Sequence, residues 1–190
     1  MLNIVLFGPP GAGKGTQSAH LIDSHQLIHL STGDLFRKHI GENTELGALA
    51  KSYMDQGNLV PDEVVIGMVE DKISHHLDAK GFVFDGFPRT VAQAEALDIM
   101  LESHKLAISG MVALAVPEEE LKQRIRERGK TSGRVDDQND EKISNRIRVY
   151  NEETAPVAHY YRDANKYNEV NGVGSIEEIY RSIEEAIGQF

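Results

Sequence analysis

One stretch of the sequence has the residue types and the spacing that bind phosphate. Gly8-Pro9-Pro10-Gly11-Ala12-Gly13-Lys14-Gly15-Thr16 follows an apolar run, 4–7, and precedes a helix-compatible segment, 17–22. In a strand–turn–helix unit of this kind the glycines leave room for an anion, backbone N–H groups and the helix N-terminus point toward it, and the lysine supplies a full charge. The stretch therefore predicts a site for nucleotide phosphates, and a plain glycine turn is the alternative. The strict pattern has Ser or Thr directly after the lysine, whereas here Gly15 precedes Thr16.

A second motif places an acid and an arginine directly after an apolar segment. Residues 82–84 are followed by Asp85-Gly86-Phe87-Pro88-Arg89. Ligands of open parallel sheets bind at the carboxyl ends of the strands. Asp85 would be suited there to hold Mg²⁺ through water, because magnesium gives up its waters reluctantly; capping of the next turn is the alternative. Arg89 could bind a phosphate with two parallel hydrogen bonds.

Residues 122–148 form a basic segment in an acidic chain. The segment holds nine Lys and Arg against five acids, a net charge of +4, whereas the chain has a formal net charge of −10. Arg124 and Arg128 share one face of a predicted helix, and a short loop with further cations, 129–134, follows. Ion pairs one turn apart, such as Glu120 with Arg124, are the alternative role for part of this charge.

The next predicted helix separates two arginines by their faces. Ile143, Ile147 and Tyr150 recur at helical spacing and mark its buried stripe. At about 100° per residue, Arg146 lies beside this stripe and Arg148 points away from it. Because an arginine at the edge of a buried face usually meets an anion, we expect Arg146 to be functional and Arg148 to be solvated.

A parallel sheet would position these groups. Short apolar segments at 3–7, 27–30, 81–84, 111–116 and 167–170 read as strands and alternate with helical stretches, which is typical of an α/β fold covered on both faces. Between the second and third strands, helices are predicted at 33–40, 45–56 and 62–77. They form an insertion with glycines 41, 47 and 57 as articulation points; a mobile cover for substrate and a static extension fit equally well. The predicted helix starts are Ser31 with Asp34, Thr90 with Gln93, Ser175 with Glu178, and an N-cap at Asp62.

Composition excludes several classes of protein. The 190 residues suit one domain, and 30 acidic against 20 basic residues argue against a general nucleic-acid or anionic-membrane surface. Cysteine is absent, which excludes disulfides and thiolate metal sites. His75 and His76 are adjacent and cannot chelate together on a helix. We expect no signal peptide, no membrane span and a cytoplasmic location.

The sequence resembles the adenylate kinases over essentially the whole chain. The resemblance is carried, in that family's order, by the segments 8–17, 31–37, 85–90 and 132–137 and by the helix that contains Arg146. The resemblance implies a P-loop, doubly wound, five-stranded parallel sheet in one domain, 1–190, with an AMP-binding helical insertion, 31–60, and a short lid, 129–136. It implies reversible phosphoryl transfer, ATP and AMP giving two ADP, which maintains the adenine nucleotide balance. Mg²⁺ would accompany ATP, and the protein would be monomeric.

The resemblance also implies roles for single residues. Catalysis would involve Lys14, Arg89, Arg124, Arg128, Arg134 and Arg146. ATP would contact Gly11, Ala12, Gly13, Lys14, Gly15, Thr16, Arg128 and Gly174. AMP would contact Thr32, Arg37, Asn58, Leu59, Val60, Gly86, Phe87, Pro88, Arg89, Gln93, Arg134 and Arg146. Magnesium would be held through water near Asp85 and Thr16.

In one respect the chain differs from the longer bacterial adenylate kinases. They carry a lid of several dozen residues, often with zinc, where this chain has only the loop 129–134; we therefore expect no zinc. A UMP/CMP kinase of the same fold and a P-loop nucleotide switch without phosphoryl transfer are the competing hypotheses. The many cations of the basic segment argue against a switch.

Overall fold

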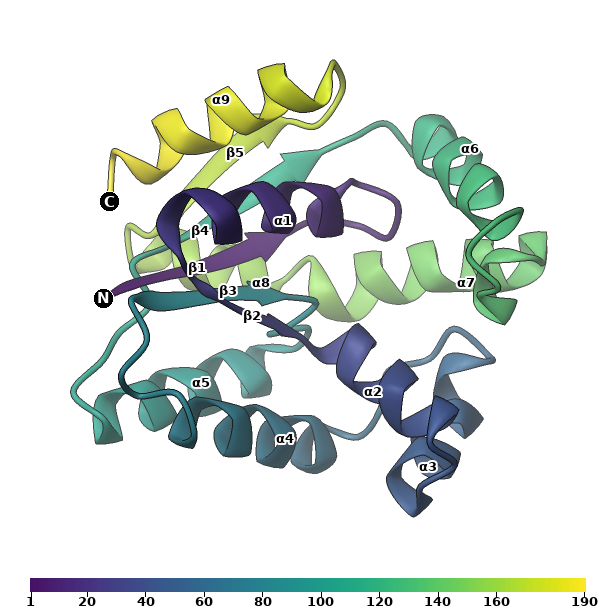
Figure 1. Cartoon of the computed structure of the whole chain (residues 1–190). Coiled ribbons are helices and arrows are strands. Elements are labelled where there is room, and N and C mark those ends of the chain that lie inside the picture. The colour runs from purple at the N-terminus through teal and green to yellow at the C-terminus, as the bar shows by residue number, and fades with distance from the viewer.

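The computed structural model describes the whole chain, residues 1–190, which is built around one parallel sheet (Figure 1). Its strands are hydrogen-bonded in the order β2-β3-β1-β4-β5, and every pairing is parallel. The predicted α/β class and its five strands are confirmed. The strands are β1 (Leu2–Phe7), β2 (Ile28–Ser31), β3 (Gly81–Asp85), β4 (Gly110–Ala115) and β5 (Tyr167–Asn171).

Helices cover both faces of the sheet, which is why successive residues of a strand are apolar (Figure 1). Ile4 and Leu6 of β1 are buried on one face, and Val5 and Phe7 on the other. The first face is covered by α1 (Lys14–His25) and α9 (Ile176–Ile187). The second face is covered by α4 (Asp62–Ser74), α5 (Val91–Ser103) and α8 (Val157–Asp163).

The carboxyl ends of the central strands bring the predicted motifs together. Asp85 at the end of β3 is the register partner of Leu6 in β1 and of Ser31 in β2. The loop after β1, which is the predicted phosphate loop, therefore begins beside the loop that carries Asp85 and Arg89. Ligands of open parallel sheets bind at this edge.

The chain between β2 and β3 forms three helices, as predicted. They are α2 (Thr32–Gly41), α3 (Glu45–Met54) and α4. Figure 1 shows α2 and α3 lying together beyond the end of β2, while α4 runs beside α5 under the sheet. Gly47, expected at an articulation point, instead allows close helix packing, because a Cβ there would lie 2.2 Å from the carbonyl oxygen of His39. Gly57 has a φ of 78°, which favours glycine.

Two predicted helix starts are wrong in detail. Pro61 is the N-cap of α4, and Asp62 is its first helical residue. At α5, Thr90 Oγ1 accepts a hydrogen bond from the backbone N–H of Gln93 (3.1 Å), but the Gln93 side chain accepts from the N–H of Arg89. This capping box is half formed, because long-range contacts hold the side chains of both Asp62 and Gln93.

The other two starts follow the prediction more closely. Ser175 and Glu178 form a complete capping box at α9. Ser31 Oγ accepts from the backbone N–H of Asp34 (3.3 Å) at α2, while the Asp34 carboxylate pairs with Arg37.

The basic segment forms two helices beyond the carboxyl ends of the strands (Figure 1). They are α6 (Glu118–Gly129) and α7 (Asp140–Val149), joined by a short loop and a 3₁₀ turn, Val135–Asp137. A π-helical turn, Tyr150–Thr154, leads from α7 to α8. None of the helices combines the length and the apolar character that a membrane crossing requires.

Candidate active site

The predicted phosphate loop joins β1 to α1 and leaves backbone N–H groups free. Gly8, Gly11 and Gly13 have positive φ values of 143°, 86° and 97°. A Cβ on Gly11 would lie 2.9 Å from Ile125 Cγ1, closer than the packing allows. Gly13 is the N-cap of α1, and no side chain caps that helix start. The first N–H groups of α1 are therefore available to an anion.

Lys14 is the cation of this loop, and its side chain pairs with no carboxylate. Its Nζ donates hydrogen bonds to the carbonyl oxygens of Gly8 (2.7 Å) and Pro9 (3.0 Å). Burial, with further repulsion from arginines such as Arg89, lowers the pKa of Lys14 to about 8, although Asp85 opposes the change. A phosphate placed here would relieve this repulsion.

A cavity of about 470 Å³ lies beside the loop. All six predicted catalytic cations line it: Lys14, Arg89, Arg124, Arg128, Arg134 and Arg146. Thr16, Asp85, Arg37, Asn58, Leu59, Gly86, Phe87 and Pro88 also line it. Ala12 belongs to the loop but is buried, and Gly174 lies just before α9; neither lines this cavity or its recess. The structure thus brings segments far apart in sequence to one place.

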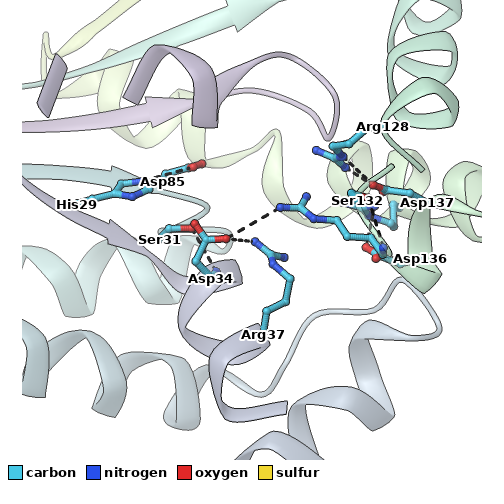
Figure 2. Close-up of polar contacts among 11 residues, drawn as sticks. His29, Ser31, Asp34, Arg37, Asp85, Arg128, Ser132, Asp136 and Asp137 are labelled. Atoms are coloured by element: carbon cyan, nitrogen blue, oxygen red, sulfur yellow. Dashed lines mark hydrogen bonds and ion pairs between the residues drawn. The ribbon is translucent and has the colours of Figure 1, made fainter. Parts of the chain in front are cut away.

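Asp137 organises two of the arginines. Its carboxylate is fully buried and accepts hydrogen bonds from Arg128 Nε (2.6 Å) and Nη2 (2.8 Å) and from Arg146 Nη1 (2.6 Å). Figure 2 shows Arg128 and Asp137 facing each other at one side of the cavity. Burial alone would raise the pKa of Asp137, but the bonds and charges of the two arginines hold it below its usual range. Asp136 adds a contact to Arg146 Nη1 at 2.8 Å.

Arg146 and Arg148 lie on different faces of α7, as predicted. The side chain of Arg146 is 19 % exposed and lines the cavity, whereas that of Arg148 is 56 % exposed and pairs with Glu152 on the surface. The helical period therefore placed both side chains.

Arg89 is fixed against the loop that follows β3. Its Nε donates to the carbonyl oxygen of Gly86 (2.8 Å), and Gly86 has a φ of 74°. Burial, with repulsion from Arg146, lowers the pKa of Arg89 to about 10. Arg89 thus stays protonated at neutral pH while lacking a carboxylate partner, as suits a guanidinium that binds an anionic ligand.

Asp34 connects two basic residues across the mouth of the cavity. It pairs with Arg37 on α2, and Arg134 Nη2 from the short loop lies 4.0 Å from its Oδ1 (Figure 2). Burial opposes ionisation, but the contact with Arg37 holds the pKa of Asp34 below its usual range. Arg124 lies at another side, where its Nε contacts Glu120 Oε1 (2.8 Å) and its Nη1 donates to the carbonyl oxygen of Gly172 (3.1 Å).

Asp85 fits the predicted role of holding magnesium through water. Burial would raise the pKa of Asp85, but His29, whose Nε2 lies 3.6 Å from Asp85 Oδ2, and the charge of Lys14 keep the pKa below its usual range. Asp85 and the exposed Thr16 place a carboxylate and a hydroxyl in the lining of the cavity. Such a donor pair leaves most positions around Mg²⁺ to water and phosphate, as magnesium prefers. No group of three or more His, Cys, Asp or Glu side chains could hold a metal ion.

A recess of about 30 Å³ opens beside the main cavity, next to α2 and α5. Its lining includes the remaining residues predicted for AMP: Thr32, Val60 and Gln93, with Asn58, Leu59, Gly86 and Arg89 shared with the main cavity. The Thr32 hydroxyl donates to the carbonyl oxygen of Gly86 (2.7 Å), so Thr32 is left with acceptor capacity.

Comparison with known proteins identifies the family. A family model described as adenylate kinase matches residues 6–166. The chain belongs to the adenylate kinase family. It is 55 % identical to an adenylate kinase of Flavobacterium psychrophilum over 98 % of both chains, and 49 % identical to that of Bacteroides fragilis over the same shares. An adenylate kinase of Porphyromonas gingivalis is 46 % identical over 100 % of this chain and 97 % of its own length.

Membership of the adenylate kinase family confirms the resemblance, the function of an adenylate kinase and the class of enzyme, a phosphotransferase.

Three residues of the site were given no role from the sequence. Asp136 and Asp137 belong to the segment 132–137, and their position next to a basic helix is the only signal in the sequence. His29 gave none, since its contact with Asp85 exists only once β2 lies beside β3.

Proposed function

We propose that the main cavity and its recess are the site at which this chain transfers a phosphoryl group from ATP to AMP, giving two ADP, and back. The proposal rests on one observation: six cations from distant segments line a single cavity beside a phosphate loop with free N–H groups. Two nucleotides whose phosphates repel each other require such a concentration of charge.

The residues are proposed to divide between two nucleotides. The phosphates of ATP bind Gly11, Ala12, Gly13, Lys14, Gly15, Thr16 and Arg128, and Gly174 contacts the ATP base. AMP binds Thr32, Arg37, Asn58, Leu59, Val60, Gly86, Phe87, Pro88, Arg89, Gln93, Arg134 and Arg146. Arg89, Arg124, Arg128, Arg134, Arg146 and Lys14 surround the phosphoryl group in transit. Ala12 and Gly174 line neither the cavity nor its recess.

Phosphoryl transfer here requires no general base. The attacking AMP phosphate is already anionic at neutral pH, so the protein has to position two anions and neutralise their charge. Mg²⁺ bound with ATP would add positive charge at the phosphates and would be held through water by Asp85 and Thr16. We propose that the protein holds no structural zinc.

Two segments would exclude water from the reaction: the insertion, 31–60, and the short lid, 129–136. The recess, about 30 Å³, is far smaller than a purine. For this reason we propose that the insertion moves outward to admit AMP. Of the two roles that the sequence left open, a mobile cover and a static extension, we therefore propose the mobile cover. We further propose one domain, 1–190, acting as a cytoplasmic monomer where ATP and AMP are available, without nucleic-acid or membrane partners.

A coupled assay tests the proposal. The purified chain with ATP, Mg²⁺ and AMP should form ADP, whereas UMP and CMP in place of AMP should give little product. Equal or better turnover with UMP or CMP would assign the chain to the pyrimidine kinases, and nucleotide binding without ADP formation would assign it to the switches.

A further inference from the structure

The side-chain amide of Gln93 is held at both ends. Gln93 is 1 % exposed. Its Oε1 accepts a hydrogen bond from the backbone N–H of Arg89 (2.7 Å), and its Nε2 donates to Asp62 Oδ1 (2.7 Å). Asp62 is itself oriented, because its Oδ2 accepts from Thr90 Oγ1 (2.9 Å). The backbone N–H of Gln93 donates to Thr90 Oγ1 (3.1 Å), so the three side chains and two backbone groups form a closed network between α4 and α5.

These contacts allow only one orientation of the amide. A backbone N–H can only donate and a carboxylate can only accept, so the oxygen of Gln93 must face Arg89 and its nitrogen must face Asp62. A flipped amide would set a donor against the N–H of Arg89 and an acceptor against the Asp62 carboxylate. A buried polar group left without a partner in this way is strongly disfavoured.

The locked amide keeps one donor and one acceptor for a ligand. Of the two Nε2 protons and two Oε1 lone pairs, one of each is used by Asp62 and Arg89. Gln93 lines the recess beside the main cavity, so the remaining proton and lone pair are what it can offer there. Their relative order along the amide is fixed by the lock.

A fixed order of donor and acceptor distinguishes purines by their substituent at C6. Adenine presents a ring-nitrogen acceptor beside an amino donor on both of its hydrogen-bonding edges. A 6-oxopurine, guanine or hypoxanthine, bound in the same place presents instead a donor beside an acceptor, or two acceptors. Gln93 could match the donor-beside-acceptor edge of a 6-oxopurine only after an amide flip, which the contacts with Arg89 and Asp62 oppose. One donor and one acceptor cannot both bond an edge that presents two acceptors.

We infer that Asp62 is a positioning residue that sets base selection by holding Gln93 in the orientation for a 6-aminopurine. The inference rests on the proposed AMP site. Asp62 itself lines neither cavity and acts through Gln93. It therefore affects the choice of nucleoside monophosphate and leaves the phosphoryl-transfer cations in place.

The test replaces the carboxylate and measures selectivity. Asp62→Ala removes the carboxylate that accepts from Gln93. Asp62→Ser also removes the carboxylate and leaves a shorter hydroxyl on a residue that suits the first turn of a helix. Glu63→Ala is the matched control, because Glu63 is the next residue of α4, is exposed, and carries the same charge at the same helix end. For each full-length variant, kcat and KM are measured for AMP and for inosine monophosphate with saturating ATP and Mg²⁺, together with the melting temperature.

The expected result is a change in the ratio of the two kcat/KM values. In Asp62→Ala and Asp62→Ser the preference for AMP should fall by about tenfold, the effect of one well-placed hydrogen bond. The change should appear mainly in KM, with kcat for AMP within a few-fold of the wild type. Asp62→Asn should keep most of the preference, since its Oδ1 can still accept from Gln93 while its amide donates to Thr90.

Three outcomes would overturn the inference: an unchanged preference in folded Asp62→Ala or Asp62→Ser, the same fall in Glu63→Ala, or an equal fall in Asp62→Asn. The proposed function is judged separately, by whether the wild-type chain forms ADP from ATP and AMP at all. A wild-type chain that forms no ADP would contradict the proposed function, whereas the three outcomes above would contradict only the role of Asp62.

Discussion

Arg146 and Arg148 give a paired test of the site, because they stand on the same helix and differ in what they face. Arg146 Nη1 contacts Asp137 at 2.6 Å and Asp136 at 2.8 Å, and its side chain lines the cavity. Arg148 bonds Asn145 (2.7 Å) and pairs with Glu152 at the surface. Replacing either with alanine removes one positive charge from α7.

The two replacements should differ greatly in size. Arg146→Ala removes a cation that we place at the transferring phosphoryl group, so kcat should fall by about 10²–10³. It also removes a charge-assisted bond from buried Asp137, which keeps its two bonds from Arg128, so the loss of stability should be about 2 kcal/mol. Arg148→Ala breaks an exposed pair worth about 0.3–0.5 kcal/mol and should leave kcat nearly unchanged.

The assay is ADP formation at saturating ATP and AMP, with thermal or urea unfolding of each variant alongside. Unfolding data are needed because an unstable Arg146→Ala protein would lose activity for an unrelated reason. If the two variants lost kcat equally, the basic segment would act as a diffuse electrostatic field. The role of Arg146 at the phosphoryl group would then be refuted.

Four further predictions concern the rest of the site. Lys14→Met should fold normally and lose about 10²–10³ in turnover, and near-normal turnover in the coupled assay would contradict its role. Because the pKa of Lys14 is lowered to about 8, kcat/KM for ATP should fall as pH rises through that value and the lysine loses its proton; Lys14→Arg should remove this fall, and a profile flat to pH 9 in the wild type would count against it. Gln93→Ala should raise KM for AMP more than for ATP, whereas equal rises that follow a lower melting temperature would indicate a purely structural residue. Metal analysis of the purified protein should find no stoichiometric zinc, and one zinc per chain would show the prediction for the short lid to be wrong.

Local patterns predicted the fold and much of the cavity. The apolar runs located all five strands, and no strand end differs from its predicted position by more than one residue. The glycine-rich stretch located the loop between β1 and α1. The faces of Arg146 and Arg148 followed from the helical period, because a regular helix fixes direction once its buried stripe is known.

What the sequence missed depends on contacts between distant segments. Asp62 suits an N-cap by local rules, yet its carboxylate holds Gln93, 31 positions away. Asp137 reads as one of several acids near a basic helix until α6 and α7 are placed side by side. Such competition between local and long-range hydrogen bonds has no signature in spacing or composition.

The buried carboxylate of Asp137 also has a consequence for how the lid can change length. Asp137 ties the end of α6, through Arg128, to α7, through Arg146, and Gly129 packs so closely against Asp137 that a Cβ would lie 2.6 Å from its carbonyl oxygen. The loop tip at Thr131, Ser132 and Gly133 is exposed and outside this tie. Doubling the length of such a loop costs only about 0.6 kcal/mol in closure entropy. Insertions at the tip would therefore lengthen the lid while Arg128 and Arg146 keep their places, so evolution can vary its size independently of these two charges.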